Sequence, residues 1–387
     1  MQNNTLFTLI SLACIIFLSP YFSRLTRMPI APIEIILGAL ASYFGLITQD
    51  HIFKLVSEVA FFFLMFLAGM EIDLRMFLNA DRKLLTKGYI YIFLLYVIAS
   101  AITFIFSLHL LFIIIIPIMS VGMIFTLFKE YGKDKEWLNL AMLIASIGEV
   151  VSIVLLTIAS SYLQYGSEPT FWLNVGYLLA FLALSMLGFK LLDVLFWWFP
   201  GFKVVLMPEY DKNEKDIRLS IAIFFSMVAL MAYLRLEIAF GAFIAGMFIA
   251  TFFDHKKDLP QKLGSFGFGF LVPIFFAYIG STLKLESIFV GSLLQNAMFI
   301  VIAMVGARFL SALVFLNLLK FKGVVLYALA HSMPLTLLIA VATIAYGTKN
   351  ISDELYSSFV LASLIEAIVS MVGIKIITSI KPKGELV

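Results

Sequence analysis

Apolar windows of about 20 residues recur along almost the whole chain. A helix needs about that length to cross the hydrocarbon core of a bilayer, where every backbone donor and acceptor must find a partner within the protein. Of the 387 residues, 62% are hydrophobic and 13% are charged, which leaves too little polar surface to coat a water-soluble globule of this size. The chain is therefore predicted to be an all-α integral membrane protein.

Charge clusters and Pro or Gly breaks divide the apolar sequence into about thirteen predicted transmembrane helices. The predicted ranges are 5–23, 29–48, 53–73, 86–107, 110–128, 137–163, 170–198, 217–235, 237–253, 264–283, 287–319, 323–346 and 355–379. The first range lacks a basic n-region and a small-residue cleavage site, so it is predicted to be a retained helix. The single cysteine, Cys14, excludes a disulfide framework and a thiolate metal cluster.

The distribution of basic residues predicts the orientation. With the N-terminus outside, the segments between helices hold 21 Lys and Arg residues on the cytoplasmic side and four on the other side. The positive-inside rule therefore favours an outside N-terminus and a cytoplasmic C-terminus. The net charge of +3 comes from these loops, so there is no basic domain for nucleic acid. Residues 1–387 are expected to form a single transmembrane domain without a soluble regulatory domain.

Three short sequence motifs recur in the same order in the two halves of the chain. The matched positions are Glu34 with Glu237, Gly69 with Gly280, and Glu149 with Glu366, at offsets of 203, 211 and 217 residues. The members of each pair lie seven helices apart in chain order, an odd number, so the partners cross the membrane in opposite directions. This pattern predicts a six-helix repeat at 5–163, a linker helix at 170–198 and a second, inverted repeat at 217–379.

Inverted repeats are chiefly a transporter device, with the substrate near the bilayer midplane beside interrupted helices. Two corresponding predicted helices contain breakers: IIIIPIMSVGM has Pro117 and Gly122, and ALAHSMPLTLL has Pro334. A proline removes one backbone donor and frees a carbonyl, which needs another partner in hydrocarbon. If both helices unwind and cross, their ends supply carbonyl oxygens and partial charges suited to a small ion. Two ordinary proline kinks are the alternative.

Glu149 is the only charge in the apolar run AMLIASIGEVVSIVLLTI. An acidic residue at mid-membrane costs roughly 2.5–3.5 kcal/mol, so something must offset it. Burial penalises the charged form of a carboxylate, so Glu149 could hold a proton and release it when a cation is offered instead. That is the chemistry of exchange between H⁺ and a monovalent cation, Na⁺ or K⁺. A purely structural buried pair is the competing interpretation.

Several polar residues are candidate ligands near Glu149. The candidates are Ser146 and Ser120, with Ser152, His331 and Ser332 as secondary positions. Ser146 and Ser152 lie on the same predicted helix as Glu149, and for each a hydrogen bond to its own backbone is an equally good interpretation. For His331, a packed and hydrogen-bonded ring is the alternative to a proton relay.

Arg308 lies in the apolar run MVGARFLSALV. Its guanidinium stays charged at any accessible pH, so it must pair or face water. Glu366 occupies the position that mirrors Glu149 in the repeat and is the candidate partner. Arg308 is therefore predicted to form a structural charge pair rather than to carry the ion.

Four segments carry a family resemblance: MPIAPIEIILGALASYFGLI, SEVAFFFLMFLAGMEIDL, FGAFIAGMFIA and LVPIFFAYIGSTLKL. They resemble the Kef-like and Nap-like members of the monovalent cation:proton antiporter-2 family over essentially the whole membrane region, with FLAGMEID and PIFF…IG the most specific. The resemblance implies the thirteen-helix sodium/proton antiporter fold with interrupted crossing helices. It also implies a homodimer, in which helices 1–3 and 8–10 form the interface side and helices 4–6 and 11–13 form a mobile, elevator-like core.

In that family the sixth helix carries an acidic pair, or an amide followed by an acid, whose second acid binds the cation or the proton. Glu149 falls on that second position and Gly148 on the first. The family's Thr-Ser pair at the first helix break reads Met119-Ser120 here. Arg308 falls where the eleventh helix carries a basic residue, commonly Lys in electrogenic members. One titrating carboxylate for one monovalent ion predicts electroneutral exchange.

The sequence therefore predicts a Na⁺ or K⁺/H⁺ antiporter of a bacterial inner membrane, surrounded by lipid and needing no cofactor. A Na⁺-coupled symporter of an organic anion and a cation-efflux channel are the alternatives. An intramembrane enzyme is not favoured, because no H-E-x-x-H motif occurs and the adjacency of His331 and Ser332 does not establish a geometry for attack.

Overall fold

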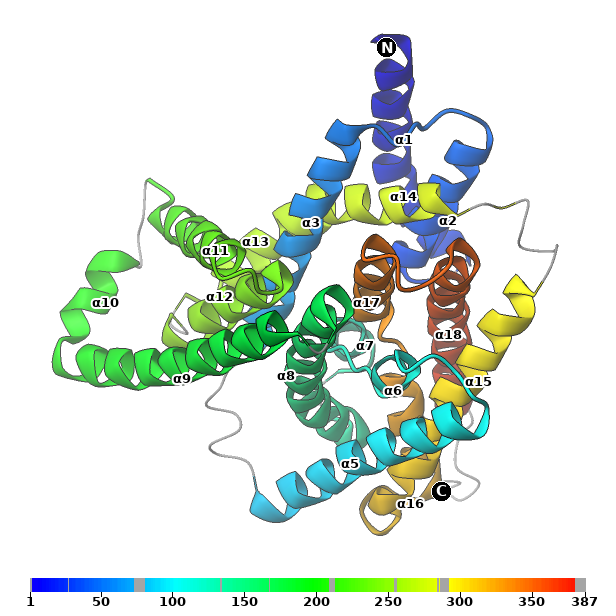
Figure 1. Ribbon diagram of the computed structural model, residues 1–387. Helices are drawn as coiled ribbons and strands as arrows, with labels where there is room; N and C mark the ends of the chain where they lie inside the picture. The colour runs from blue at the N-terminus through cyan, green and yellow to red at the C-terminus, as the bar shows by residue number, and fades with distance from the viewer. Residues whose placement is uncertain are drawn as a thin grey trace, which may run out of the picture. The chain divides into compact units, whose positions relative to one another are not determined.

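The computed structural model describes residues 2–26, 28–72, 81–132, 134–166, 168–208, 213–253, 256–283, 285 and 292–379. In these ranges all regular structure is helical and no strand occurs, as the sequence predicts (Figure 1). Nine helices of the described chain are long and apolar enough to cross a membrane, and three shorter apolar helices accompany them. The protein is an all-α membrane protein.

The α-helices keep the labels of Figure 1. They are α1 (Gln2–Thr26), α2 (Ile30–Tyr43), α3 (His51–Met70), α5 (Arg82–Ile105), α6 (Phe112–Ile115), α7 (Gly122–Tyr131), α8 (Glu136–Tyr165), α9 (Pro169–Trp198), α10 (Pro200–Leu206), α11 (Lys215–Tyr233), α12 (Ile238–Phe252), α13 (Leu259–Phe266), α14 (Val272–Thr282), α15 (Leu293–Ala312), α16 (Leu316–His331), α17 (Leu335–Gly347) and α18 (Asp353–Ser379). A π-helical turn, η1 (Gly267–Leu271), joins α13 to α14, and a 3₁₀ turn, η3 (Leu313–Phe315), joins α15 to α16.

Long apolar runs fix most of these helices. The predicted ranges 137–163, 170–198 and 355–379 correspond to α8, α9 and α18, with ends that differ by at most two residues. A helix bounded by polar or Gly/Pro segments has few other lengths available when it must also span a bilayer. The short helix α10 was not predicted, because its seven residues are too few to show a helical period.

Two predicted helices are each divided in the structure. The predicted range 110–128 becomes α6 and α7, with residues 116–121 outside any helix. The predicted range 323–346 becomes the end of α16 and all of α17, with residues 332–334 between them. The predicted boundary between 319 and 323 lies at Lys320, whose φ of 55° interrupts α16. Both divided helices are those in which the sequence contains proline breakers.

The chain forms two compact units. Unit 1 comprises Met1–Tyr21, Glu34–Leu78 and Thr157–Thr282, and unit 2 comprises Phe22–Ile33, Asn79–Leu156 and Leu283–Val387. This division matches the grouping that the family resemblance implies, because predicted helices 1–3 and 8–10 lie mainly in unit 1 and 4–6 and 11–13 mainly in unit 2. The helix α8 contributes to both units, since the division falls within it after Leu156.

In unit 1, glycines let pairs of helices approach until their backbones touch. A Cβ atom on Gly69 of α3 would lie 2.0 Å from the carbonyl oxygen of Phe243 in α12, and one on Gly246 of α12 would lie 2.0 Å from that of Phe66 in α3. These distances are shorter than any Cβ contact, so only glycine permits this crossing.

The helices α2 and α14 repeat the same arrangement. A Cβ atom on Gly280 would lie 2.0 Å from the carbonyl oxygen of Ile35, and one on Gly38 would lie 2.3 Å from that of Ala277. The two crossings are reciprocal when Gly69 is matched with Gly280 and Gly38 with Gly246. The first match has the offset of 211 residues that the sequence motifs give. The second has an offset of 208 residues, and the predicted match of Glu34 with Glu237 has an offset of 203.

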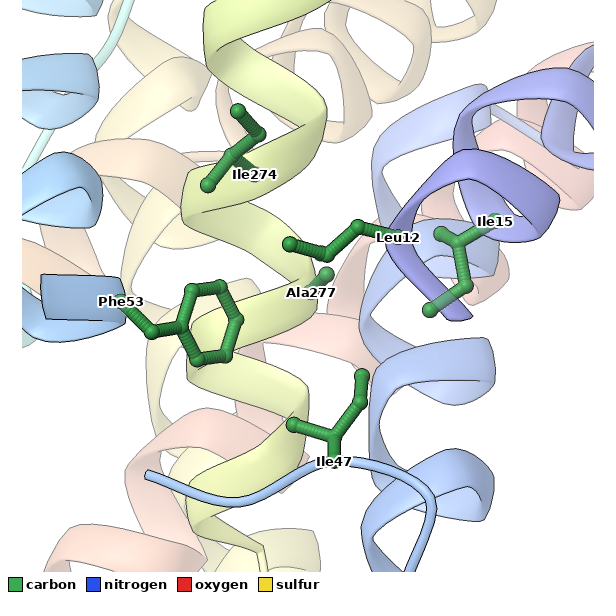
Figure 2. Packing of buried hydrophobic residues seen from close by; sticks show 6 residues of the cluster. All are labelled: Leu12, Ile15, Ile47, Phe53, Ile274 and Ala277. Carbon is green, nitrogen blue, oxygen red and sulfur yellow. The ribbon is translucent and has the colours of Figure 1, made fainter. Parts of the chain in front are cut away.

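A cluster of buried side chains surrounds α14 in unit 1 (Figure 2). Its members come from α1, from the segment between α2 and α3, from α3 and from α14; they are Leu12, Ile15, Ile47, Phe53, Ile274 and Ala277. The ring of Phe53 also packs edge-on against Tyr278, with 5.2 Å between the centroids. These contacts hold α1, the start of α3 and the segment between α2 and α3 against α14. The limits of the two repeats, 5–163 and 217–379 around 170–198, stay a prediction.

Candidate ion site

The non-helical residues 116–121 lie against α8 within unit 2. Two backbone amides of this segment find partners on α8 side chains: Met119 N donates to Ser152 Oγ at 3.2 Å, and Val121 N donates to Glu149 Oε2 at 3.0 Å. Buried amides outside a helix must be paired, and in hydrocarbon water does not supply the partner. The two acceptors lie about one helical turn apart on α8, so one face of α8 holds the break.

Glu149 is fully buried, and both of its carboxylate oxygens accept hydrogen bonds from the break. Oε2 accepts from Val121 N, and Oε1 accepts from Ser120 Oγ at 3.3 Å. Ser120 Oγ also lies 3.3 Å from Thr336 Oγ1 of α17, the helix that follows the second break. The two interrupted helices therefore meet at the Ser120 hydroxyl, which is bonded to the Glu149 carboxylate. No Lys, Arg or His side chain of the described ranges is paired with it.

Arg308 of α15 and Glu366 of α18 form an ion pair in which both side chains are fully buried. Arg308 Nη1 donates to Glu366 Oε1 at 2.9 Å, and Nη2 donates to the backbone carbonyl of Ile118 at 2.6 Å. In the segment 116–121, two backbone amides therefore donate to side chains of α8, and the Ile118 carbonyl accepts from Arg308 of α15. Glu366 has a permanent cation beside it, whereas the charge on Glu149 is met only by neutral donors.

The remaining candidate serines and His331 mostly bond to their own helices. Ser146 Oγ donates to the Met142 carbonyl at 2.8 Å, so its hydroxyl is engaged within α8. Ser332 Oγ donates to the Ala328 carbonyl at 2.9 Å, and His331 Nδ1 lies 3.0 Å from the Tyr327 carbonyl. The geometry brings Ser120 and Ser152 to the break at Glu149 and does not bring these three residues there.

His331 is packed between aromatic rings. Its ring centroid lies 4.3 Å from that of Tyr327 and 5.5 Å from that of Tyr91.

Of the breaker residues, Pro117 lies in the first break, Gly122 begins α7, and Pro334 directly precedes α17. The prolines thus stand where the missing amide costs no helical hydrogen bond.

Gly148, next to Glu149, makes room for the side chain of Met119. A Cβ atom on Gly148 would lie 1.8 Å from Met119 Cε and 2.8 Å from Met119 Sδ, and Met119 is 1% exposed. The thioether of Met119 therefore occupies the space where a side chain at position 148 would begin. Gly148 and Met119 both depart from the family pattern, and the side chain of Met119 fills the space that the glycine leaves open.

Gly148→Ala is expected to destabilise the protein by about 1 kcal/mol, because displacing a buried methionine outweighs the gain in helix propensity. In the Met119→Ala background the same substitution is expected to stabilise, since the obstructing atoms are gone. Thermal unfolding in detergent measures both effects. Gly306→Ala in α15 is the matched control, because nothing lies within 4 Å of a Cβ atom there. Destabilisation of equal size in both backgrounds would contradict the contact.

Sequence reasoning missed the groups that complete the site. The backbone amides of Met119 and Val121 and the carbonyl of Ile118 carry no sequence signal. Thr336 belongs to the second predicted break, ALAHSMPLTLL, but is not among the predicted ligands. Pairing the hydroxyls of the two breaks, Ser120 with Thr336, would add it to them.

Comparisons with known proteins identify the family and the fold. A family model described as the transmembrane sodium/hydrogen exchanger matches residues 12–379. The chain is 26% identical to the putative Na(+)/H(+) antiporter YjbQ of Bacillus subtilis, over 97% of this chain and 63% of YjbQ. It is 24% identical to the probable Na(+)/H(+) antiporter 3 of Methanocaldococcus jannaschii, over 93% of each. The chain thus spans less than two thirds of the length of YjbQ.

Among solved structures, the fold is similar to that of the sodium proton antiporter MjNhaP1 from Methanocaldococcus jannaschii at pH 8. The TM-score is 0.69 and the sequence identity 14%, over 97% of this chain and 99% of that one. At this identity the likeness shows the fold, and the fold is that of the sodium/proton antiporters. With the family model matching nearly all of its length, the chain belongs to the family of transmembrane sodium/hydrogen exchangers.

Proposed function

We propose that the protein exchanges Na⁺ or K⁺ for H⁺ across a membrane, with Glu149 as the site that the two ions occupy in turn. One observation carries the proposal: the Glu149 carboxylate is fully buried where the two interrupted helices meet, and its partners are neutral donors. A buried anion without a fixed countercharge is stabilised by a proton or by a metal cation. The two cannot occupy the same oxygens together.

The rest of the site supports this role. Carboxylate and hydroxyl oxygens are the ligands that hard monovalent cations prefer, and Ser120 Oγ lies beside Glu149 Oε1. The charge of Arg308 is matched by Glu366, so the pair adds no net charge to the exchange. One carboxylate that trades one proton for one monovalent cation makes the exchange electroneutral. The names of the two relatives, both Na(+)/H(+) antiporters, agree with the proposal.

The proposal extends to the setting of the transporter. All residues of the site belong to unit 2, as an elevator-like movement of that unit requires. Unit 1 supplies the interface side of a homodimer, whose apolar outer surface contacts lipid. The membrane is a bacterial inner membrane, with the N-terminus outside and the C-terminus in the cytoplasm.

Reconstitution into proteoliposomes tests the proposal. With an imposed pH gradient and a pH-sensitive dye inside, added Na⁺ or K⁺ is expected to collapse the gradient, whereas choline leaves it unchanged. The rate with Na⁺ is expected to stay within about twofold when a membrane potential is imposed, because no net charge moves. Li⁺, in a parallel assay, ranks the cations.

Three results would argue against it. A rate that rises steeply with the membrane potential would overturn the electroneutral stoichiometry. Cation flux without proton movement would indicate a channel, and Na⁺-dependent uptake of an organic anion would indicate a symporter. Empty liposomes and liposomes without a gradient are the controls.

A further inference from the structure

The hydroxyl of Ser120 lies between two oxygens, Glu149 Oε1 and Thr336 Oγ1, each 3.3 Å away. A serine hydroxyl has one hydrogen to donate and lone pairs with which to accept. An ionised carboxylate only accepts, so Ser120 must donate to Glu149 whenever that carboxylate is charged and empty. Thr336 is then the donor to Ser120, and the hydroxyl hydrogens point from α17 towards α8.

A cation on Glu149 reverses this direction. A cation beside Oε1 repels the hydroxyl hydrogen and attracts the lone pair of Ser120, so the hydrogen must turn to another acceptor. Thr336 Oγ1 is the acceptor within reach. Thr336 then accepts, and its own hydrogen leaves the pair.

A proton on Glu149 has the same effect. Oε2 already accepts from the backbone N–H of Val121 at 3.0 Å, and an N–H cannot turn round. The proton is therefore placed on Oε1, which faces Ser120, and the resulting O–H donates to the serine oxygen. Ser120 again donates to Thr336. Either ion thus produces one arrangement of the hydroxyl pair, and the empty carboxylate produces the other.

We propose that the Ser120–Thr336 hydroxyl pair reports the occupancy of Glu149 to the second interrupted helix, with Thr336 as a positioning residue that favours the occupied site. This inference rests on the proposed function, since it assumes that Glu149 binds both ions. An exchanger must move with an ion bound and stay still when empty. A contact in the first turn of α17 that distinguishes these two conditions, without distinguishing Na⁺ from H⁺, meets that need.

Thr336→Val tests the inference, because it keeps the shape and removes the acceptor. In the occupied site the Ser120 hydrogen then has no partner, whereas in the empty site Ser120 keeps its bond to Glu149 and loses only the bond it accepts from Thr336. The occupied site is therefore penalised more than the empty one. At a pH high enough that the site without cation is the ionised carboxylate, the apparent KM for the cation is expected to rise about tenfold, with the maximal rate within about twofold of wild type. Thr336→Ser, which restores the hydroxyl, is expected to return the KM to near the wild-type value.

Three further measurements separate this role from simple damage. Thr343→Val, two turns along α17, removes a hydroxyl that bonds only to the Ile339 carbonyl, and is expected to leave the KM unchanged. In the Ser120→Ala background, Thr336→Val is expected to have no further effect on the KM. The Na⁺ concentration that raises the melting temperature in detergent is expected to increase about tenfold in Thr336→Val, which needs no transport.

A wild-type KM in Thr336→Val, or an effect that adds fully to that of Ser120→Ala, would overturn the inference while leaving the exchange itself intact. A loss confined to the maximal rate, with unchanged Na⁺ dependence of melting, would also overturn it. If the wild-type protein exchanges no cation, the proposed function fails first.

Discussion

Glu149→Gln is expected to abolish cation-dependent proton exchange, lowering the rate in proteoliposomes by at least about 100-fold. The amide has the shape of the carboxylate but neither loses a proton nor attracts a cation. Its carbonyl oxygen can accept from Val121 N and its NH₂ group can donate to Ser120, which is the hydrogen-bond pattern of the protonated acid. The folded structure should therefore survive, and the melting temperature should stay close to that of wild type.

Glu34→Gln is the matched control for this variant. Glu34 is 3% exposed and accepts a hydrogen bond from Ser19 Oγ at 3.1 Å, but it belongs to unit 1, whereas the break belongs to unit 2. Glu34→Gln should exchange at the wild-type rate. A correctly folded Glu149→Gln protein that exchanges as fast as wild type would show that the ion is carried elsewhere.

Among the substitutions considered, Arg308→Met is expected to lower the free energy of unfolding most, by about 3–5 kcal/mol. The substitution leaves the Glu366 carboxylate buried without its cation and removes the donor to the Ile118 carbonyl, so two buried groups lose their partner at once. Unfolding in detergent, by heat or by titration with a denaturing detergent, measures the effect. Because the Ile118 carbonyl belongs to the break beside Glu149, exchange should also fall in the protein that remains folded.

The double variant Arg308→Met with Glu366→Leu provides the control. Replacing a whole buried ion pair by apolar side chains is often close to neutral, whereas removing one partner is not. Most of the stability lost in Arg308→Met should therefore return, apart from the share due to the Ile118 carbonyl. Unchanged melting of Arg308→Met would contradict the pair.

The elements that the sequence predicts are those set by the bilayer. The ends of α8, α9 and α18 follow from where long apolar runs stop, since the length of a membrane helix is fixed from outside the protein. The interruption between α6 and α7 follows from local chemistry, because Pro117 cannot donate to a helical carbonyl wherever the chain goes. Glu149 is conspicuous for a similar reason, as a charge in hydrocarbon needs a function or a partner.

The contacts that build the site depend on positions far apart in the chain. Arg308 and the Ile118 carbonyl are brought together across 190 residues, and a carbonyl exists at every position, so no pattern distinguishes this one. Ser146 shows the opposite case: its spacing from Glu149 fits a ligand, but its hydroxyl donates to the Met142 carbonyl one turn earlier in its own helix. The alignment of α2 with α12, its counterpart in the repeat, is also not fixed by the sequence, because apolar motifs of four or five residues recur by chance.

The two kinds of glycine in this protein differ in whether damage to them can be repaired. A side chain at Gly148 collides with the end of Met119, so a second mutation at codon 119 can suppress the first. A side chain at Gly69 or Gly246 collides with a backbone carbonyl oxygen, which every residue carries. A second mutation at the contacted residue cannot remove it, so at these crossings no suppressor is expected at the contacted residue.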